Sequence, residues 1–187
     1  MLVDLKALTK MLKKYGKKDF AVQRSGDVAY ITNNAVAVRL PEKDLRGVLA
    51  IHPEMFERDG VIRDGIYRSS NPPDIAKVWR DTTDNPDLRD AEDTRLSLAG
   101  PGEDMRILVL ADCYVIVNVE YFAPFKNCRF KATAPEKPVV VYDAEEPIAI
   151  IMPIRLNEYI KAVLSTYLVA PKGKRGGEHD QSDGHSG

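Results

Sequence analysis

The sequence predicts an α+β fold, in which short helices flank antiparallel strands within a single domain. Helical periodicity of apolar residues occurs near both ends of the chain, at 4–15 and 157–169. Between these segments, short apolar stretches of strand character alternate with turn signals. The chain has 187 residues, of which 44% are hydrophobic, so it is long enough to bury one core but short for two. We therefore expect one domain over residues 1–169.

The segment 4–15 is the clearest helix. Asp4 is a suitable N-cap, and Gly16 follows the last helical position. The apolar residues at helical spacing are Leu5, Leu8, Met11, Leu12 and Tyr15. At about 100° per residue, five lysines fall on the opposite face: Lys6, Lys10, Lys13, Lys14 and Lys17. One helix is thus expected to have a core side and a cationic side, with Asp4 as the only acid among residues 1–18.

Two short segments of strand character follow the helix, at 20–27 and 28–41. The second is broken at Asn33-Asn34, a pair that favours a tight turn. This pattern predicts a meander.

Periodicity is weaker from about 44 to 104. Prolines and Asp-Gly or Asn-Pro pairs interrupt this region, and only a short helix around 74–81 stands out. We predict a long irregular insertion or a functional loop. Trp79, the only tryptophan, is expected to anchor this region to the core; the alternative is a partner contact.

Regular patterns return at 105–119, which predicts two strands joined near Ala111. A brief helix that ends or kinks at Pro124 is expected within 120–127. Further strand-like segments lie at 128–135, 137–144 and 148–156. The order of elements along the chain predicts two related α/β halves.

The end of the chain is predicted to contain a helix and a tail. The helix at 157–169 has an apolar stripe of Ile160, Val163, Leu164, Tyr167 and Leu168. Residues 170–187 have no apolar content to offset the entropy of ordering, so a disordered polar tail is expected.

The stretch YVIVNVEYFAPFKNCRFKATAPEKPVVVYDAEEPIAIIMPIRL, residues 114–156, resembles the C-terminal domain of the bacterial sliding clamp, the β subunit of DNA polymerase III. The start of the family's helix is matched by Asn118, Glu120, Tyr121 and Phe122, and its Met-Pro-Met-Arg-Leu terminus by Met152, Pro153, Ile154, Arg155 and Leu156. The amino-terminal segments are compatible with a clamp by order of elements, not by motif. The resemblance implies a clamp-like (processivity-fold) domain of two α/β halves with antiparallel sheets.

In clamps the terminal segment forms a wall of a shallow apolar pocket for short peptide motifs of replication and repair proteins. The matching candidates here are Ile150, Met152, Pro153, Ile154 and Arg155. The fixed φ of proline would hold such a wall in place. The alternative is a core strand that leaves its sheet at Pro153.

Clamps also line their hole with helices whose basic side chains contact the backbone of duplex DNA. The resemblance assigns this role to Lys6, Lys10, Lys13, Lys14 and Lys17, although lysines on a solvated helix face also serve solubility alone. It implies a non-catalytic protein without a cofactor or metal, acting in replication, repair or a mobile element. A ring would require a homo-oligomer, because a clamp subunit has three such domains. Residues 157–187 extend beyond the family's terminus.

Two other functions remain open. Asp81, Asp84, Asp87, Asp90 and Asp93 recur every third residue. They suit either a solvated acidic loop or the Mg²⁺ or Ca²⁺ site of a metal-dependent hydrolase, although they do not fit an EF-hand. The second alternative is an interaction protein without a DNA role, in which the helix at 157–169 covers its own groove.

Charge, cysteine content and hydropathy bear on location. The formal net charge is −1, so any attraction to DNA must be local. Cys113 and Cys128 are expected to be free thiols in a reducing compartment. Asp4 and Lys6 interrupt any opening apolar run, and no stretch reaches the roughly 18 apolar residues of a membrane span. We expect a cytoplasmic protein with no membrane partner.

Overall fold

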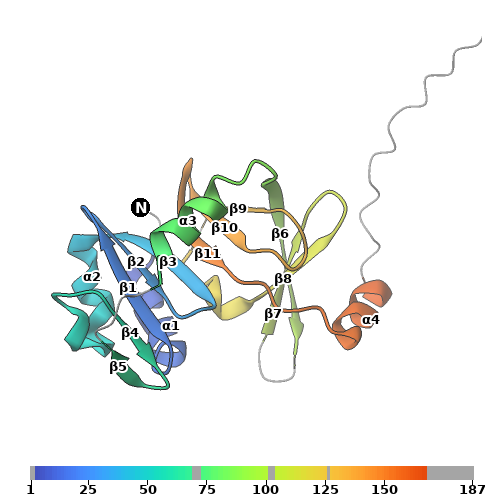
Figure 1. Cartoon of the computed structure of the whole chain (residues 1–187). Helices are drawn as coiled ribbons and strands as arrows, with labels where there is room; N and C mark the ends of the chain where they lie inside the picture. Colours follow the sequence, from blue (N-terminus) through green and yellow to red (C-terminus); the bar gives the residue numbers. More distant parts are fainter. Residues whose placement is uncertain (1–2, 69–72, 101–103, 126, 168–187) are drawn as a thin grey trace, which may run out of the picture.

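A computed structural model describes residues 3–68, 73–100, 104–125 and 127–167 (Figure 1). The described part contains four α-helices and an antiparallel sheet of eleven strands, which confirms the α+β prediction. The helices are α1 (Leu5–Tyr15), α2 (Glu42–Val48), α3 (Ile75–Thr83) and α4 (Glu158–Tyr167). None of the helices that the structure describes is both long and apolar enough to cross a membrane.

The strands form one continuous sheet in the order β5-β4-β1-β2-β3-β11-β10-β9-β6-β7-β8. The first five are β1 (Phe20–Ser25), β2 (Val28–Thr32), β3 (Val36–Pro41), β4 (Gly60–Arg63) and β5 (Ile66–Arg68). The others are β6 (Arg89–Ala99), β7 (Asp104–Val109), β8 (Tyr114–Asn118), β9 (Arg129–Ala132), β10 (Val139–Asp143) and β11 (Glu146–Ile151).

Two three-stranded meanders meet at the middle of this sheet. The predicted meander β1-β2-β3 is confirmed, and β9-β10-β11 forms a second one. They join through β3 and β11, with Ala37 opposite Ile150. The meanders differ in what precedes them, because α1 precedes β1 whereas only a short 3₁₀ helix, η3 (Val119–Tyr121), lies between β8 and β9. The brief helix predicted within 120–127 is therefore reduced to this 3₁₀ turn.

Helix α1 forms where the sequence predicts it. The Asp4 carboxylate accepts a hydrogen bond of 2.9 Å from the Ala7 N–H, which satisfies one of the free donors of the first turn. Leu8, Met11 and Leu12 are buried on the opposite side from the lysines. Burial of this apolar stripe fixes which face of the helix remains in water.

The sheet around β1, β2, β3 and β11 is covered on both faces. Phe20 and Val22 of β1 point into the main core with α1 and α2, whereas Ala21 points into a second cluster beneath α3. Trp79 of α3 is 4% exposed and packs on Tyr30, with ring centroids 5.4 Å apart. The expectation that Trp79 anchors its region to the core is confirmed.

The prediction of an irregular insertion at about 44–104 is wrong. The described residues of this region form most of α2, all of β4, β5, α3 and β6, and two 3₁₀ turns. The Asp64-Gly65 pair that seemed to break the pattern makes the β4–β5 hairpin turn, with φ of 52° and 77°. Short elements separated by turn residues carry too few apolar positions for their periodicity to be recognised.

Arg24 ties this region to β1. Its guanidinium lies 2.9 Å from the Asp59 carboxylate and donates to the Met55 and Phe56 carbonyls at 2.8 Å each. These bonds hold the connection between α2 and β4 against the sheet.

Helix α4 lies at the end of the molecule opposite α2 (Figure 1). Ile160 and Leu164 pack on Met105, Ile107 and Ile116 of β7 and β8. These two residues confirm the centre of the predicted stripe, while Leu168 and the predicted tail at 170–187 lie outside the described residues.

Candidate functional site

Exposed lysines of α1 and of the turn after it form the first candidate site, which we call the lysine face: Lys6, Lys10 and Lys13 of the helix, and Lys17 of the turn. Three of them, with Asp4, Ala7 and Thr9, line a shallow hollow of about 580 Å³. Among the described residues, none of these four ammonium groups has an ion-pair partner, so the helix presents uncompensated positive charge.

Lys14 departs from the prediction, because its charge is compensated. Its Nζ lies 2.6 Å from Oε1 of Glu120, and the Tyr15 hydroxyl donates to Oε2 of the same carboxylate at 2.6 Å. The hydrogen bond with Glu120 raises the pKa of Lys14, and the bonds from Lys14 and Tyr15 lower the pKa of Glu120. Glu120 belongs to η3, so this acid is distant in sequence and near in space.

The terminal segment does not form the single wall that the sequence suggested. Ile150 is 5% exposed and packs beneath α3 with Tyr30 and Trp79, so it is a core residue. The reason is strand alternation, which points Ile150 into the face that α3 covers.

The residues after β11 run from β3 towards β8. The Met152 N–H donates to the Ala35 carbonyl and the Ile154 N–H to the Ile116 carbonyl, each at 2.7 Å. Ile154 is half-buried and packs with the α4 cluster, while Pro153 is also half-buried. Only Met152, 43% exposed, and Arg155 remain well exposed. The apolar candidates therefore do not share one surface: Ile150 lies beneath α3, Ile154 packs with the α4 cluster, and Met152 is exposed.

The five predicted metal-binding aspartates are not gathered together. Asp81 lies in α3 and Asp84 is its C-cap, whereas Asp90 and Asp93 lie in β6. Within the part of the chain that the structure describes, no group of three His, Cys, Asp or Glu side chains is placed to hold a metal ion. The fifth, Asp87, lies in the turn between α3 and β6.

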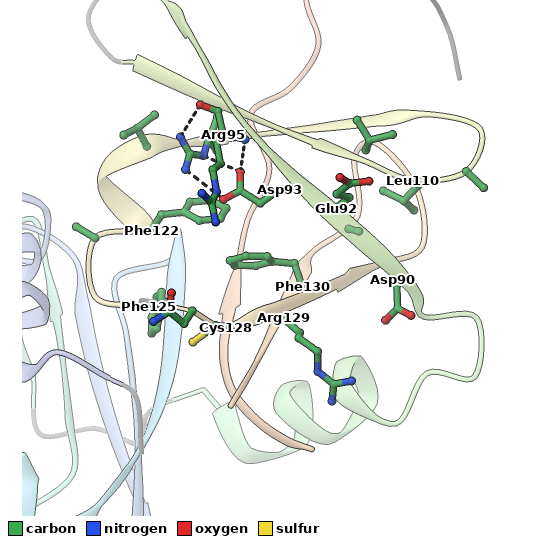
Figure 2. Close-up of a pocket in the computed structure, with 17 residues that line it drawn as sticks. Asp90, Glu92, Asp93, Arg95, Leu110, Phe122, Phe125, Cys128, Arg129 and Phe130 are labelled. Atoms are coloured by element: carbon green, nitrogen blue, oxygen red, sulfur yellow. Dashed lines mark hydrogen bonds and ion pairs between the residues drawn. The ribbon is translucent and has the colours of Figure 1, made fainter. Parts of the chain in front are cut away.

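Sequence reasoning missed a hollow of about 1140 Å³ beside β6, which we call the β6–β9 hollow (Figure 2). Its walls come from β6, β7, β9 and residues within 119–125 and 127–128. Phe122, Phe125 and Phe130 supply aromatic surface, and the rings of Phe122 and Phe130 lie 4.9 Å apart. The Cys128 thiol in this wall is half-buried, and this burial raises its pKa to about 11.

Charged side chains surround this aromatic surface. Those that line the hollow are Asp90, Glu92, Asp93, Arg95, Arg106 and Arg129. Nε of Arg106 lies 2.8 Å from the Asp93 carboxylate, so this pair closes one side of the rim. The four charged residues within DAEDTR, residues 90–95, are the sequence signal for this rim, but the pattern of a single strand does not reveal which other strands face it.

Comparison with known proteins finds no family model, curated protein or solved structure that matches the chain. The functional assignment therefore depends on the geometry of these sites.

Proposed function

We propose that this chain is a non-catalytic domain of the sliding-clamp type, which contacts the backbone of duplex DNA through its lysine face and binds peptide segments of replication or repair proteins. The observation that carries the proposal is the row of uncompensated ammonium groups on one rigid, exposed face of α1. The two meanders that meet through β3 and β11 are consistent with the paired halves of a clamp domain.

The lysine face suits recognition of phosphates without reading of bases. Lysine is a flexible point charge, and contacts from ammonium groups to phosphate position a protein on a duplex without sequence information. Each phosphate neutralised contributes roughly −0.9 to the slope of log K against log salt. Binding should therefore weaken steeply with salt and differ little between sequences.

The peptide role is proposed for the exposed part of the terminal segment. Met152 supplies an apolar side chain at the surface and Arg155 an exposed cation three positions later. Backbone hydrogen bonds at residues 152 and 154 hold the segment in place, which reduces the entropy lost when a peptide binds.

Fluorescence anisotropy with a labelled duplex tests the DNA role. Replacement of Lys6, Lys10 and Lys13 by Gln should reduce affinity and make the salt slope shallower by roughly 2 to 3. The matched control replaces Lys43, Lys77 and Lys137, which are exposed on other parts of the molecule. Absence of binding by the wild type at low salt, or an equal loss in the control, contradicts the proposal.

A second candidate function is an interaction protein in which α4 covers its own groove. The packing of Ile154 and Leu156 with Ile160 and Leu164 favours it, because α4 then covers apolar surface next to the terminal segment. Truncation after Leu156 should expose this surface. Peptide binding that appears only in the truncated chain supports the second candidate, and equal binding by both forms contradicts it.

A further inference from the structure

Arg95 stands on an unusual backbone at the rim of the β6–β9 hollow. The β6–β7 register shifts between Asp93 and Ser97, and Arg95 has a φ of 59° within this bulge. A left-handed conformation costs a non-glycine residue roughly 1–2 kcal/mol. Residues with such strain occur preferentially at functional sites, which makes this bulge the first place to look for one.

The bulge is fixed from both sides of Arg95. The Arg95 N–H donates to the Asp93 carboxylate at 2.9 Å, and the Arg95 carbonyl accepts from Arg106 at 3.1 Å. The Thr94 hydroxyl donates to the Ile107 carbonyl at 2.8 Å and accepts from the Leu96 N–H at 3.1 Å. The backbone is thus held in place while the guanidinium of Arg95 makes no hydrogen bond or ion pair among the described residues.

Most other charges of the rim are already compensated. Arg106 pairs with Asp93, and Arg129 lies 2.6 Å from Glu145, which is outside the hollow. Asp90 has only a 3.9 Å contact with Lys131.

Two charges of the lining then remain without any ion-pair partner in the described chain, the cation of Arg95 and the anion of Glu92. Asp90 is paired with Lys131 and Ala91 with Phe130 across β6 and β9, so strand alternation points Asp90 and Glu92 away from the face that carries Phe130. The cation of Arg95 is therefore the unpaired charge that can act together with the aromatic wall.

An exposed apolar residue follows Arg95 in the bulge. Leu96, next to Arg95 in the bulge, is 52% exposed and is one of the few large apolar residues at the described surface. Arginine and aromatic side chains are enriched at the centres of protein interfaces. A free arginine beside a hollow with phenylalanines in its wall has the composition of a surface that contacts protein.

From these observations we infer that the β6–β9 hollow binds an extended segment of a partner protein, in which an acidic residue lies two positions from a large apolar side chain. The apolar side chain packs on Phe122 and Phe130. The acidic residue faces Arg95. A nucleic acid fits less well, because the carboxylates of Asp90, Glu92 and Asp93 at the rim would repel phosphates. This site is separate from the lysine face, so its failure would leave the DNA proposal intact.

Three blocked pentapeptides test the inferred charge pattern: Asp-Gly-Phe-Gly-Lys, Asp-Gly-Phe-Gly-Asp and Lys-Gly-Phe-Gly-Lys. Amide chemical shifts of the full ¹⁵N-labelled chain report both the affinity and the place of binding. The two peptides that begin with aspartate should bind the wild type more tightly than the peptide with two lysines, and they should shift amides around Arg95, Phe122 and Phe130. Exchange of the central phenylalanine for serine should abolish these shifts, because the apolar contact is lost.

Arg95→Glu should reverse the order in favour of the peptide with two lysines, by about three- to tenfold relative to the wild type, as expected for exchange of one partly exposed charge pair. Arg95→Gly suits the positive φ, so it preserves the fold and should remove only the preference for an acidic residue.

Arg46→Glu, on the exposed face of α2, is the matched control and should leave the order unchanged. The inference would be overturned if none of the three peptides shifted amides at the hollow, or if Arg95→Glu left the order of affinities unchanged. It would also be overturned if duplex DNA, and not the peptides, shifted the same amides.

Discussion

The lysine face and the β6–β9 hollow carry charge in different ways. The lysine face is built from one helix and the turn that follows it, its ammonium groups have no described ion-pair partners, and its four lysines are exposed. The hollow takes its charged residues from three strands, β6, β7 and β9, and most of them are paired with one another or with neighbouring residues. Charge on the helix is available to a ligand, whereas most charge in the hollow maintains the structure and leaves a small remainder for recognition.

The largest expected effect is slow alkylation of Cys128, which reports how well the wall of the hollow is shielded from water. Because burial raises the pKa of Cys128 to about 11, its thiolate is scarce at pH 8, and alkylation by iodoacetamide should be slower than for an unshifted cysteine by a factor on the order of a hundred. The rate should rise with pH up to the region of this pKa. Mass spectrometry of the intact and digested chain measures it.

Cys113 provides an internal comparison for this rate. Its pKa is also raised, by burial and by Asp112, so it too should react slowly. Ordinary alkylation of Cys128 at pH 8 would show that the wall of the hollow is open to water.

Charged side chains that are paired in the hollow should contribute to stability, whereas the unpaired lysines of the lysine face should not. Asp93→Ala should lower the free energy of unfolding by about 2 kcal/mol, because it removes the Arg106 pair and the hydrogen bond from the Arg95 N–H. Replacement of the lysine-face residues by Gln should leave stability nearly unchanged. Denaturant unfolding measures both.

Asp81→Ala is the control for Asp93→Ala, because Asp81 is exposed on α3. Equal stability of the Asp93 and Asp81 variants would contradict the view that pairing in the hollow supports the bulge.

The difference between the two regions also explains what the sequence predicts. The face of α1 depends on neighbours three and four positions apart, so a local pattern is enough to place Lys6, Lys10 and Lys13. The meander β1-β2-β3 is predicted for the same reason, since its pairing is between successive segments.

Features that depend on distant pairing could not be predicted in this way. Phe130 and Arg95 lie on strands separated in sequence by β7 and β8, and nothing in either segment specifies the β6–β9 pairing. Ile150 was misplaced because a continuous apolar strand does not show which face a helix will cover. Glu120 could not be assigned to Lys14 because the pair spans 106 positions.

The smallest expected effect arises where the two regions meet. Glu120 pairs with Lys14 of α1, and its neighbours Val119 and Phe122 line the hollow. Glu120→Gln removes the acid that compensates Lys14, so the lysine face gains one available cation. Under the proposed DNA role, duplex affinity should rise modestly and the salt slope should steepen by roughly 0.9.

The pH dependence of stability provides an independent check on this pair. The pKa of Glu120 is lowered by Lys14 and Tyr15, so the pair stabilises the fold above the ordinary pKa of a carboxyl group, about 4.3, and this contribution is lost as the pH falls through the lower folded-state pKa. The wild type should therefore be slightly more stable than Glu120→Gln at pH 7, and the difference should disappear in acid.

Lys14→Gln distinguishes the two roles of the pair, because it removes the same interaction without adding a cation. It should match Glu120→Gln in stability but should not gain affinity for the duplex. If both variants bind DNA equally, charge compensation by Glu120 does not govern the lysine face. If Glu120→Gln alone gains affinity, the lysine face responds to each ammonium group that is released.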